Sequence, residues 1–320
     1  MNKGVFLLSQ RVLLLDTKTI EKMKEFYQDD LASKLPPGAL FAAKPFNCSV
    51  TAYKSGKVLF QGAKHEEEAA IWEQFANNGT APPTTKTVTK KEATNQSQFS
   101  TMSLIGSDEV GTGDYFGPIT VVAAFVRTEN FANLTELGVK DSKGMKDDQI
   151  CKIAKQLIKE IPYSLLVLPN TKYNSLQAKG FNQGKMKAIL HNQAILHLKK
   201  KLNHEPYDGI LIDQFVERGI YFRYIADQKE KVQENNMFFQ TKAESLHLSV
   251  AAASIIARYA FVKEMDKLSE SAGFEIPKGA GSHVDQAAAK LIRTHGIEAL
   301  NSYCKIHFAN TEKAKKHLKL

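Results

Sequence analysis

Residues 104–118 read LIGSDEVGTGDYFGP, and this stretch decides how the second part of the chain folds. Its first half is a short apolar run that ends on two acids, a pattern typical of a β-strand. Its second half, rich in glycine, predicts a tight turn. Residues 119–126 follow as a second β-rich run, so the sequence predicts a hairpin here.

Beyond this hairpin, strand-like and helix-like patterns alternate, which indicates an α/β domain. The expected strands are 164–168, 209–213 and 237–241. The expected helices are 146–160, 184–202, 245–268, 284–294 and 297–303.

The first part of the chain predicts a small α+β unit. Strands are expected at 5–15, 40–43, 49–53 and 58–61, and helices from residue 16 or 17 to about 31 and over 65–75. Residues 77–100 are rich in Thr, Asn, Pro, Ser and Lys and poor in apolar side chains, so they cannot bury enough surface to offset the entropy of ordering them. We therefore expect an N-terminal domain at 1–78, a flexible linker at 79–100 and a second, larger domain at 101–320.

The composition is that of a globular protein, with 43% hydrophobic and 24% charged residues among 320. No apolar run is long enough to cross a bilayer, and no secretory signal is apparent, so we expect a cytoplasmic protein without a membrane partner. The three cysteines are far apart and fit a reducing compartment. The net charge of +9 favours an anionic partner, most commonly nucleic acid. We expect a monomer.

Four carboxylates stand at positions where catalytic acids occur in α/β folds. Asp108 and Glu109 end the first strand, Asp213 ends the apolar strand GILID, and Glu244 precedes an alanine-rich helix. Clustered carboxylate oxygens suit Mg²⁺ or Mn²⁺. Each acid taken alone is more readily explained as a turn or cap residue than as a catalytic one. The sequence alone does not show that the four lie close together in the fold.

Three separate motifs resemble the type 2 ribonucleases H. They are SDEVGTGDYFGP at 107–118, DSK at 141–143 and SVAAASIIAR at 249–258. The GTGDYFGP turn, Glu244 in place of Asp, and KGAGS at 278–282 point to the bacterial ribonuclease HIII branch. AYKSGKVLFQG at 52–62 resembles the extra domain of that branch, which is related to half of the TATA-binding protein.

The resemblance implies a ribonuclease H-like mixed sheet flanked by helices, preceded by the small TATA-binding-protein-like domain. It implies an endonuclease that hydrolyses the RNA strand of RNA/DNA hybrids with two Mg²⁺ or Mn²⁺ ions, leaving 3′-OH and 5′-phosphate ends. Asp108, Glu109, Asp213 and Glu244 match the catalytic, metal-binding quartet. Asp108 would bridge both ions, Asp213 and Glu244 would complete their shells, and Glu109 would bind a metal or the ribose 2′-OH.

Substrate contacts are expected in both domains. In the catalytic domain they are the backbone of Gly111, Thr112 and Gly113 together with Lys143 and Arg258. In the N-terminal domain, which is rich in basic residues, they are Tyr53, Lys54 and Lys57. Related ribonuclease HII enzymes carry an Arg where Thr112 stands, so the sequence favours substrates with several ribonucleotides over a single one.

Two other functions are compatible with part of this pattern. A non-catalytic nucleic-acid-binding protein would use the same basic surfaces, but it gains nothing from acids clustered beside phosphate. An integrase-like or DNA nuclease on the ribonuclease H fold would need different motifs after Asp108.

Overall fold

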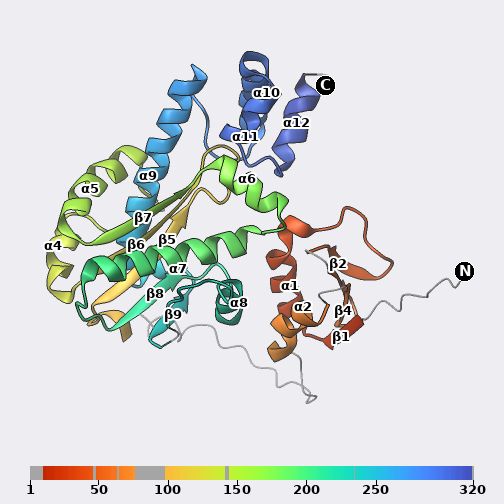
Figure 1. Cartoon of the computed structure of the whole chain (residues 1–320), viewed down its shortest axis with the longest axis horizontal. Coiled ribbons are helices and arrows are strands. Elements are labelled where there is room, and N and C mark those ends of the chain that lie inside the picture. Colours follow the sequence, from red (N-terminus) through yellow and green to blue (C-terminus); the bar gives the residue numbers. More distant parts are fainter. Residues whose placement is uncertain are drawn as a thin grey trace, which may run out of the picture. The chain divides into compact units, whose positions relative to one another are not determined.

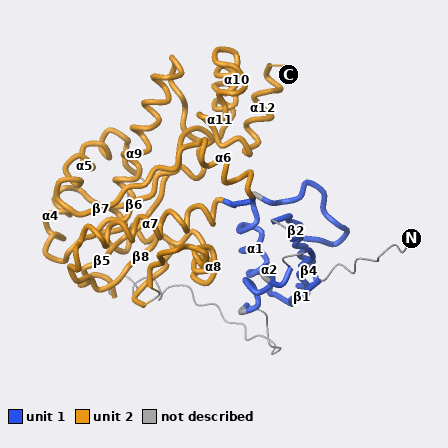
Figure 2. The backbone as a smooth tube through the Cα atoms, viewed as in Figure 1, with its two compact units in different colours: residues 1–88, 180–182 blue, residues 89–179, 183–320 orange. Residues whose placement is uncertain are grey.

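The computed structural model describes residues 10–45, 48–62, 65–75, 98–140, 144–233 and 235–318. The chain divides into two compact units, 1–88 with 180–182 and 89–179 with 183–320 (Figure 2). Lys143, residues 5–9 of the first expected strand and most of the expected linker lie outside the described residues. No helix of the described segments is long and apolar enough to cross a membrane.

Unit 1 is built on a four-stranded antiparallel sheet with the strand order β1-β4-β3-β2. The strands are β1 (Gln10–Leu14), β2 (Ala39–Ala43), β3 (Ser49–Tyr53) and β4 (Lys57–Gln61), and the helices are α1 (Thr17–Phe26) and α2 (His65–Trp72). Alternate strand residues point to opposite faces. One face, which includes Phe41 and Phe60, is buried against aromatic side chains such as Tyr27 and Trp72.

The other face of this sheet carries exposed apolar side chains. Val12 and Leu14 on β1 are 52% and 53% exposed, and Leu40 on β2 is also exposed. Tyr53, half-buried, ends β3 where the chain turns into the hairpin that precedes Lys57. The described parts of the expected strands are therefore present, whereas both helices are shorter than expected: α1 ends at Phe26 and α2 at Trp72, and each is followed by a short 3-10 turn. The hairpin residues border an open face of the sheet.

Unit 2 contains a five-stranded mixed sheet with the order β7-β6-β5-β8-β9 (Figure 1). Its strands are β5 (Leu104–Val110), β6 (Ile119–Val126), β7 (Tyr163–Leu168), β8 (Gly209–Asp213) and β9 (Met237–Gln240). β5, β6 and β7 pair antiparallel, whereas β8 and β9 join parallel to β5. This confirms the ribonuclease H-like mixed sheet that the sequence predicts.

Helices cover both faces of the central sheet. α9 (Leu248–Ala272) and α5 (Asp147–Glu160) share a core with β6 on one face, whereas α7 (Gln183–Leu202) contacts β5 from the other. The C-terminal helices are α10 (Ser282–His295), α11 (Leu300–Tyr303) and α12 (Ala309–His317). The sequence did not predict α4 (Phe131–Glu136), α6 (Asn170–Ala178), α8 (Arg218–Tyr224) or α12.

The expected linker ends inside unit 2. Residues 98 and 99 are helical, and Phe99 is buried in a cluster with Leu104, Leu211 and Val250. The last residues of the segment therefore contribute an apolar side chain to the core beneath β5 and β8.

Gly106 sets the distance between β5 and α9. A Cβ atom at this position would lie 2.3 Å from the Ser249 carbonyl carbon and the Val250 nitrogen, so only glycine permits this approach. The first turn of α9 thus rests on the backbone of β5, two residues before Asp108.

The side chain of His247 caps α9. Its Nδ1 accepts a hydrogen bond from the Ser249 N–H at 3.0 Å, and its Nε2 lies 3.1 Å from the Met102 carbonyl oxygen. Nδ1 therefore carries no proton and Nε2 donates. Burial lowers the pKa of His247 from 6.5 to about 4, because the imidazolium form would be desolvated and would lose the cap.

We predict that His247 makes the stability of unit 2 fall as the pH falls from 6.5 to 4. In that window the unfolded chain binds a proton that the folded chain does not, so protonation favours unfolding by about 3 kcal/mol in total. His247→Asn keeps a cap acceptor and removes this contribution. Urea unfolding of both proteins at pH 7, 5.5 and 4 measures it, and equal pH dependence in the two would contradict the prediction.

Candidate active site

Three of the predicted acids meet at one edge of the central sheet. Asp108 lies on β5 and Asp213 ends β8, and these parallel strands pair up to Ser107 and Ile212, one residue before each acid. Glu244 lies in the short 3-10 turn η5 (Ala243–Ser245) immediately before α9. The carboxyl ends of parallel strands border a crevice, so this edge is where an α/β fold places a site.

The four predicted acids line one pocket of about 430 Å³. The complete lining is Asp108, Glu109, Val110, Met145, Asp147, Ile150, Asp213, Glu244, Ser254 and Arg258. The fold therefore brings together residues that are separated by more than a hundred positions, which the sequence alone could not do.

Asp108 is a buried acid of the pocket, with only 7% of its surface exposed. Its Oδ1 accepts a hydrogen bond from the Glu109 N–H at 2.7 Å, and the Ser254 side chain from α9 is a second partner. Burial, followed by the negative charges of Glu109 and Asp213, nevertheless raises the pKa of Asp108 well above its usual range. A nearby cation would stabilise the negative charge of the Asp108 carboxylate, and none of the causes of its pKa shift is a cation.

Asp213 and Glu244 are linked through the backbone. Asp213 Oδ1 accepts a hydrogen bond from the Ala243 N–H at 2.9 Å, which fixes the turn that carries Glu244. Glu244 itself is only 4% exposed. One carboxylate thus positions the next, at the start of the helix that also provides Ser254.

Glu109 is held from the opposite side of the sheet. Its Oε1 lies 2.9 Å from Lys187 Nζ and its Oε2 lies 2.9 Å from His191 Nε2, both on α7. Burial opposes ionisation, but Lys187 and His191 outweigh it and lower the pKa of Glu109 to about 2. Glu109 is therefore a carboxylate at all physiological pH values.

Lys187 and His191 were not predicted from the sequence as site residues. The Nδ1 atom of His191 lies 2.7 Å from the Ser107 hydroxyl, and both Lys187 and His191 contact the ring of Phe215. The spacing of Lys187 and His191 could have indicated them, because residues four apart lie on the same face of a helix. Charged or polar groups on a buried helix face need a partner, so such a pair predicts a nearby acid.

Arg258 lines the same pocket, and Lys278 is joined to it through the pocket residue Asp147. Arg258 on α9 contacts Asp147 through Nε to Oδ1 at 2.9 Å, and Lys278 Nζ lies 2.7 Å from Asp147 Oδ2. Burial opposes ionisation of Asp147, but the two cations outweigh it and hold its pKa below the usual range. Arg258, which the sequence analysis predicts as a substrate contact, thus lies in the same pocket as the acids, whereas Asp147 was not predicted as a site residue.

The glycine-rich turn leaves β5 beside this pocket. Gly111 has a φ of +99°, and a Cβ atom there would lie 2.2 Å from the Pro118 carbonyl oxygen, so the turn requires glycine. Gly113 is exposed, with no heavy atom within 4 Å of its ideal Cβ position. The Thr112 carbonyl accepts a hydrogen bond from Gln183 on α7 at 3.2 Å.

The remaining predicted contacts lie elsewhere. Tyr53, Lys54 and Lys57 belong to the β3–β4 hairpin of unit 1, not to the unit that holds the pocket. Lys143 lies outside the described residues.

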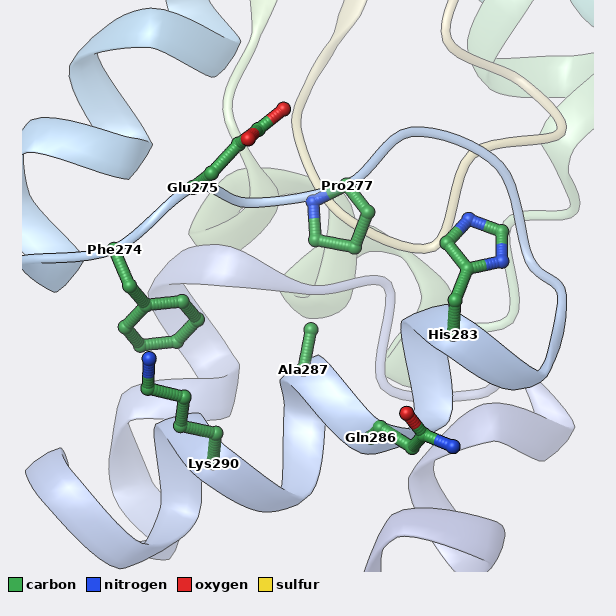
Figure 3. Close-up of a pocket in the computed structure, with 7 residues that line it drawn as sticks. All are labelled: Phe274, Glu275, Pro277, His283, Gln286, Ala287 and Lys290. Carbon is green, nitrogen blue, oxygen red and sulfur yellow. The ribbon is translucent and has the colours of Figure 1, made fainter.

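A second pocket, of about 510 Å³, lies between the chain after α9 and helix α10 (Figure 3). Lys290 Nζ lies 4.2 Å from the centre of the Phe274 ring. The one acid of its lining, Glu275, points away from the other labelled side chains. This pocket therefore lacks the several carboxylates that line the first.

The donors of the acidic pocket fit a hard divalent cation, because they are carboxylate oxygens and the Asp108 charge is uncompensated. Within the described ranges, however, no three Asp, Glu, His or Cys side chains stand close enough to hold an ion together as they are. The three acids share a pocket without converging on one point, as mutual repulsion of carboxylates predicts.

Comparisons with known proteins agree with this geometry. The family model described as Ribonuclease HII matches residues 105–311, and a domain of unknown function matches residues 10–85. The ribonuclease HIII of Bacillus pumilus is 59% identical over 310 residues, covering 97% of this chain and 99% of that protein. The Bacillus subtilis ribonuclease HIII is 53% identical, covering 97% and 98%.

A solved structure is similar over almost the same length. The crystal structure of Bst-RNase HIII in complex with Mn²⁺ has 45% sequence identity and a TM-score of 0.70, covering 97% of this chain and 99% of that one. Sequence, fold and acidic pocket lead to one conclusion: the chain belongs to the ribonuclease HIII family and is an endoribonuclease of the ribonuclease H type.

Proposed function

We propose that this protein hydrolyses the RNA strand of RNA/DNA hybrids in a reaction that needs two Mg²⁺ or Mn²⁺ ions and leaves 3′-OH and 5′-phosphate ends. The observation that carries the proposal is the pocket in which Asp108, Asp213 and Glu244 meet. A cluster of buried carboxylates repels nucleic acid unless divalent cations neutralise it.

Asp108, Asp213 and Glu244 would hold the ions. When bound, one ion would lower the pKa of the attacking water and the other would stabilise the leaving 3′ oxygen. Asp108 lies on β5, next to the strand β8 that ends on Asp213, and it would contribute a carboxylate to holding the ions. The Glu109 N–H and Ser254 fix its orientation for that purpose.

Glu109 retains capacity for a further partner although α7 holds it. Each carboxylate oxygen can accept two hydrogen bonds or ligands, and Lys187 and His191 use one position on each. Glu109 can therefore bind a metal or accept a hydrogen bond from the ribose 2′-OH while it keeps its contacts with Lys187 and His191 of α7. The 2′-OH is the group that distinguishes RNA from DNA at a cleavage site.

Backbone atoms of Gly111, Thr112 and Gly113 would contact the sugar-phosphate chain next to the pocket. The open surface at Gly113 supports this, since no other part of the described chain fills the space where a side chain would project. Thr112 offers no guanidinium, so we expect substrates with several consecutive ribonucleotides.

Basic groups would supply affinity that does not depend on sequence. Arg258 and Lys143 would contact phosphates near the pocket, and Tyr53, Lys54 and Lys57 would contact the hybrid from unit 1. The open sheet face beside this hairpin, with Val12 and Leu14 exposed, supports a binding role for that unit.

We predict that Asp213→Asn abolishes cleavage and leaves hybrid binding intact. Asparagine keeps the oxygen that accepts from the Ala243 N–H, so the turn that carries Glu244 is preserved while a ligand charge is lost. Cleavage rates and hybrid affinity of the variant are compared with those of Asp266→Asn, which removes an exposed acid paired with Lys263. More than about a tenth of the wild-type rate, roughly 1.4 kcal/mol of barrier, would remove Asp213 from the catalytic set.

A second prediction separates substrate contact from folding in the glycine-rich turn. Gly113→Ala should raise KM several-fold while the free energy of unfolding changes by less than about 1 kcal/mol, because the added methyl meets only substrate. Gly111→Ala should instead lower the free energy of unfolding by more than about 1 kcal/mol, because its φ and the Pro118 carbonyl both oppose a side chain. An unchanged KM for Gly113→Ala would exclude this contact.

A third prediction concerns unit 1. Replacing Lys54 and Lys57 together by Ala should flatten the slope of log K against log salt by about 1.8, since each neutralised phosphate contributes about 0.9. The matched control replaces Lys18 and Lys22, two exposed lysines of α1, by Ala. Equal slopes for the two double variants would show that the hairpin does not contact the hybrid.

A further inference from the structure

We infer that Lys278 and Arg258, held by Asp147, form a phosphate subsite at the wall of the acidic pocket. Its ligand would be a backbone phosphodiester of the RNA strand, next to the one that is cut. The inference rests on the proposed function and extends it, because it assigns Lys278 to substrate and gives Asp147 a positioning role.

The two cations converge on one oxygen. Asp147 Oδ2 lies 2.7 Å from Lys278 Nζ and 3.3 Å from Arg258 Nη2, so the two nitrogens lie within about 6 Å of each other. Charged donors contact phosphate oxygens at about 2.7–2.9 Å, so one phosphate group can reach both. Lys278 and Arg258 keep 36% and 28% of their side-chain surface exposed, so a ligand can reach them.

The charge of this cluster has the sign that a phosphate needs. Two cations and one carboxylate leave a net charge of +1, in a pocket whose other ionisable side chains are acids. Asp147 therefore holds both cations in one place, Arg258 through two nitrogens and Lys278 through Nζ.

The surrounding structure fixes each member. Asp147 begins α5, and Arg258 leaves α9 with its guanidinium 5.6 Å from the centre of the Phe261 ring. Gly279, which follows Lys278, donates its N–H to Asp114 Oδ1 at 2.6 Å and accepts from the Tyr115 N–H at 2.9 Å. The segment that carries Lys278 is thus attached to the glycine-rich turn expected to follow the same strand of nucleic acid.

The test measures binding of an RNA/DNA hybrid in EDTA, so that no cleavage occurs, over a series of KCl concentrations. Lys278→Met should weaken binding several-fold and flatten the slope of log K against log salt by about 0.9. The matched control is Lys315→Met on α12, because Lys315 is 33% exposed and also lies 2.7 Å from a carboxylate, that of Glu312.

Asp147→Asn separates a substrate site from a purely structural ion-pair cluster. If the cations bind phosphate, removing the competing carboxylate should leave hybrid affinity equal or higher, while kcat falls because the phosphate next to the cut one is no longer held in a fixed position. If the cluster only joins α5 to α9, the variant should lose unfolding free energy and bind hybrid more weakly. The second result, or a Lys278→Met variant indistinguishable from Lys315→Met, would overturn the inference.

Failure of this inference differs from failure of the proposed function. A wild-type protein that neither binds nor cuts the hybrid would refute the proposed function itself. A wild-type protein that cuts the hybrid, with Lys278→Met behaving as the control does, would refute the subsite alone.

Discussion

The contact between Gly106 and the first turn of α9 is the constraint on which the site depends. Because no side chain separates the helix from β5, α9 begins directly over the strand that carries Asp108. That approach delivers Ser254 and Arg258 to the pocket and places Glu244 at its edge. The neutral His247 cap, bonded to Met102, fixes where the helix begins.

Strand geometry assigns different environments to neighbouring acids. Asp108 faces α9 and has a raised pKa, whereas Glu109 faces α7 and has a lowered one. Lys187 and His191 thus stabilise the ionised form of Glu109. At Asp108 ionisation is opposed by burial and by the neighbouring carboxylates Glu109 and Asp213.

The sequence predicted the strands, the long helices and the four acids because apolar runs and terminal carboxylates are local patterns. It could not show that Asp213 fixes the turn of Glu244, or that Lys187 and His191 neutralise Glu109, because those contacts join separate elements. Helices such as α8 are short and have weak periodicity, so no local pattern marks them. The family resemblance predicted the quartet, and the pairing of β5 with β8 explains why Asp108 and Asp213 lie close together.

The glycine-rich turn shows how an exposed backbone can be kept in one conformation. Lys305 is fully buried, and its ammonium donates to the Asp114 and Gly117 carbonyls at 2.7 and 2.6 Å. Burial lowers the pKa of Lys305 to about 7, because desolvation of the ammonium outweighs the attraction of Asp114 and Cys304. Lys305, from the C-terminal part of the chain, supports the turn at Asp114 and Gly117, and the space beside Gly113 contains no heavy atom within 4 Å of its ideal Cβ position. A turn that the rest of the protein already holds in one conformation loses little conformational entropy on binding. Its N–H groups can therefore bind a sugar-phosphate chain without help from side chains.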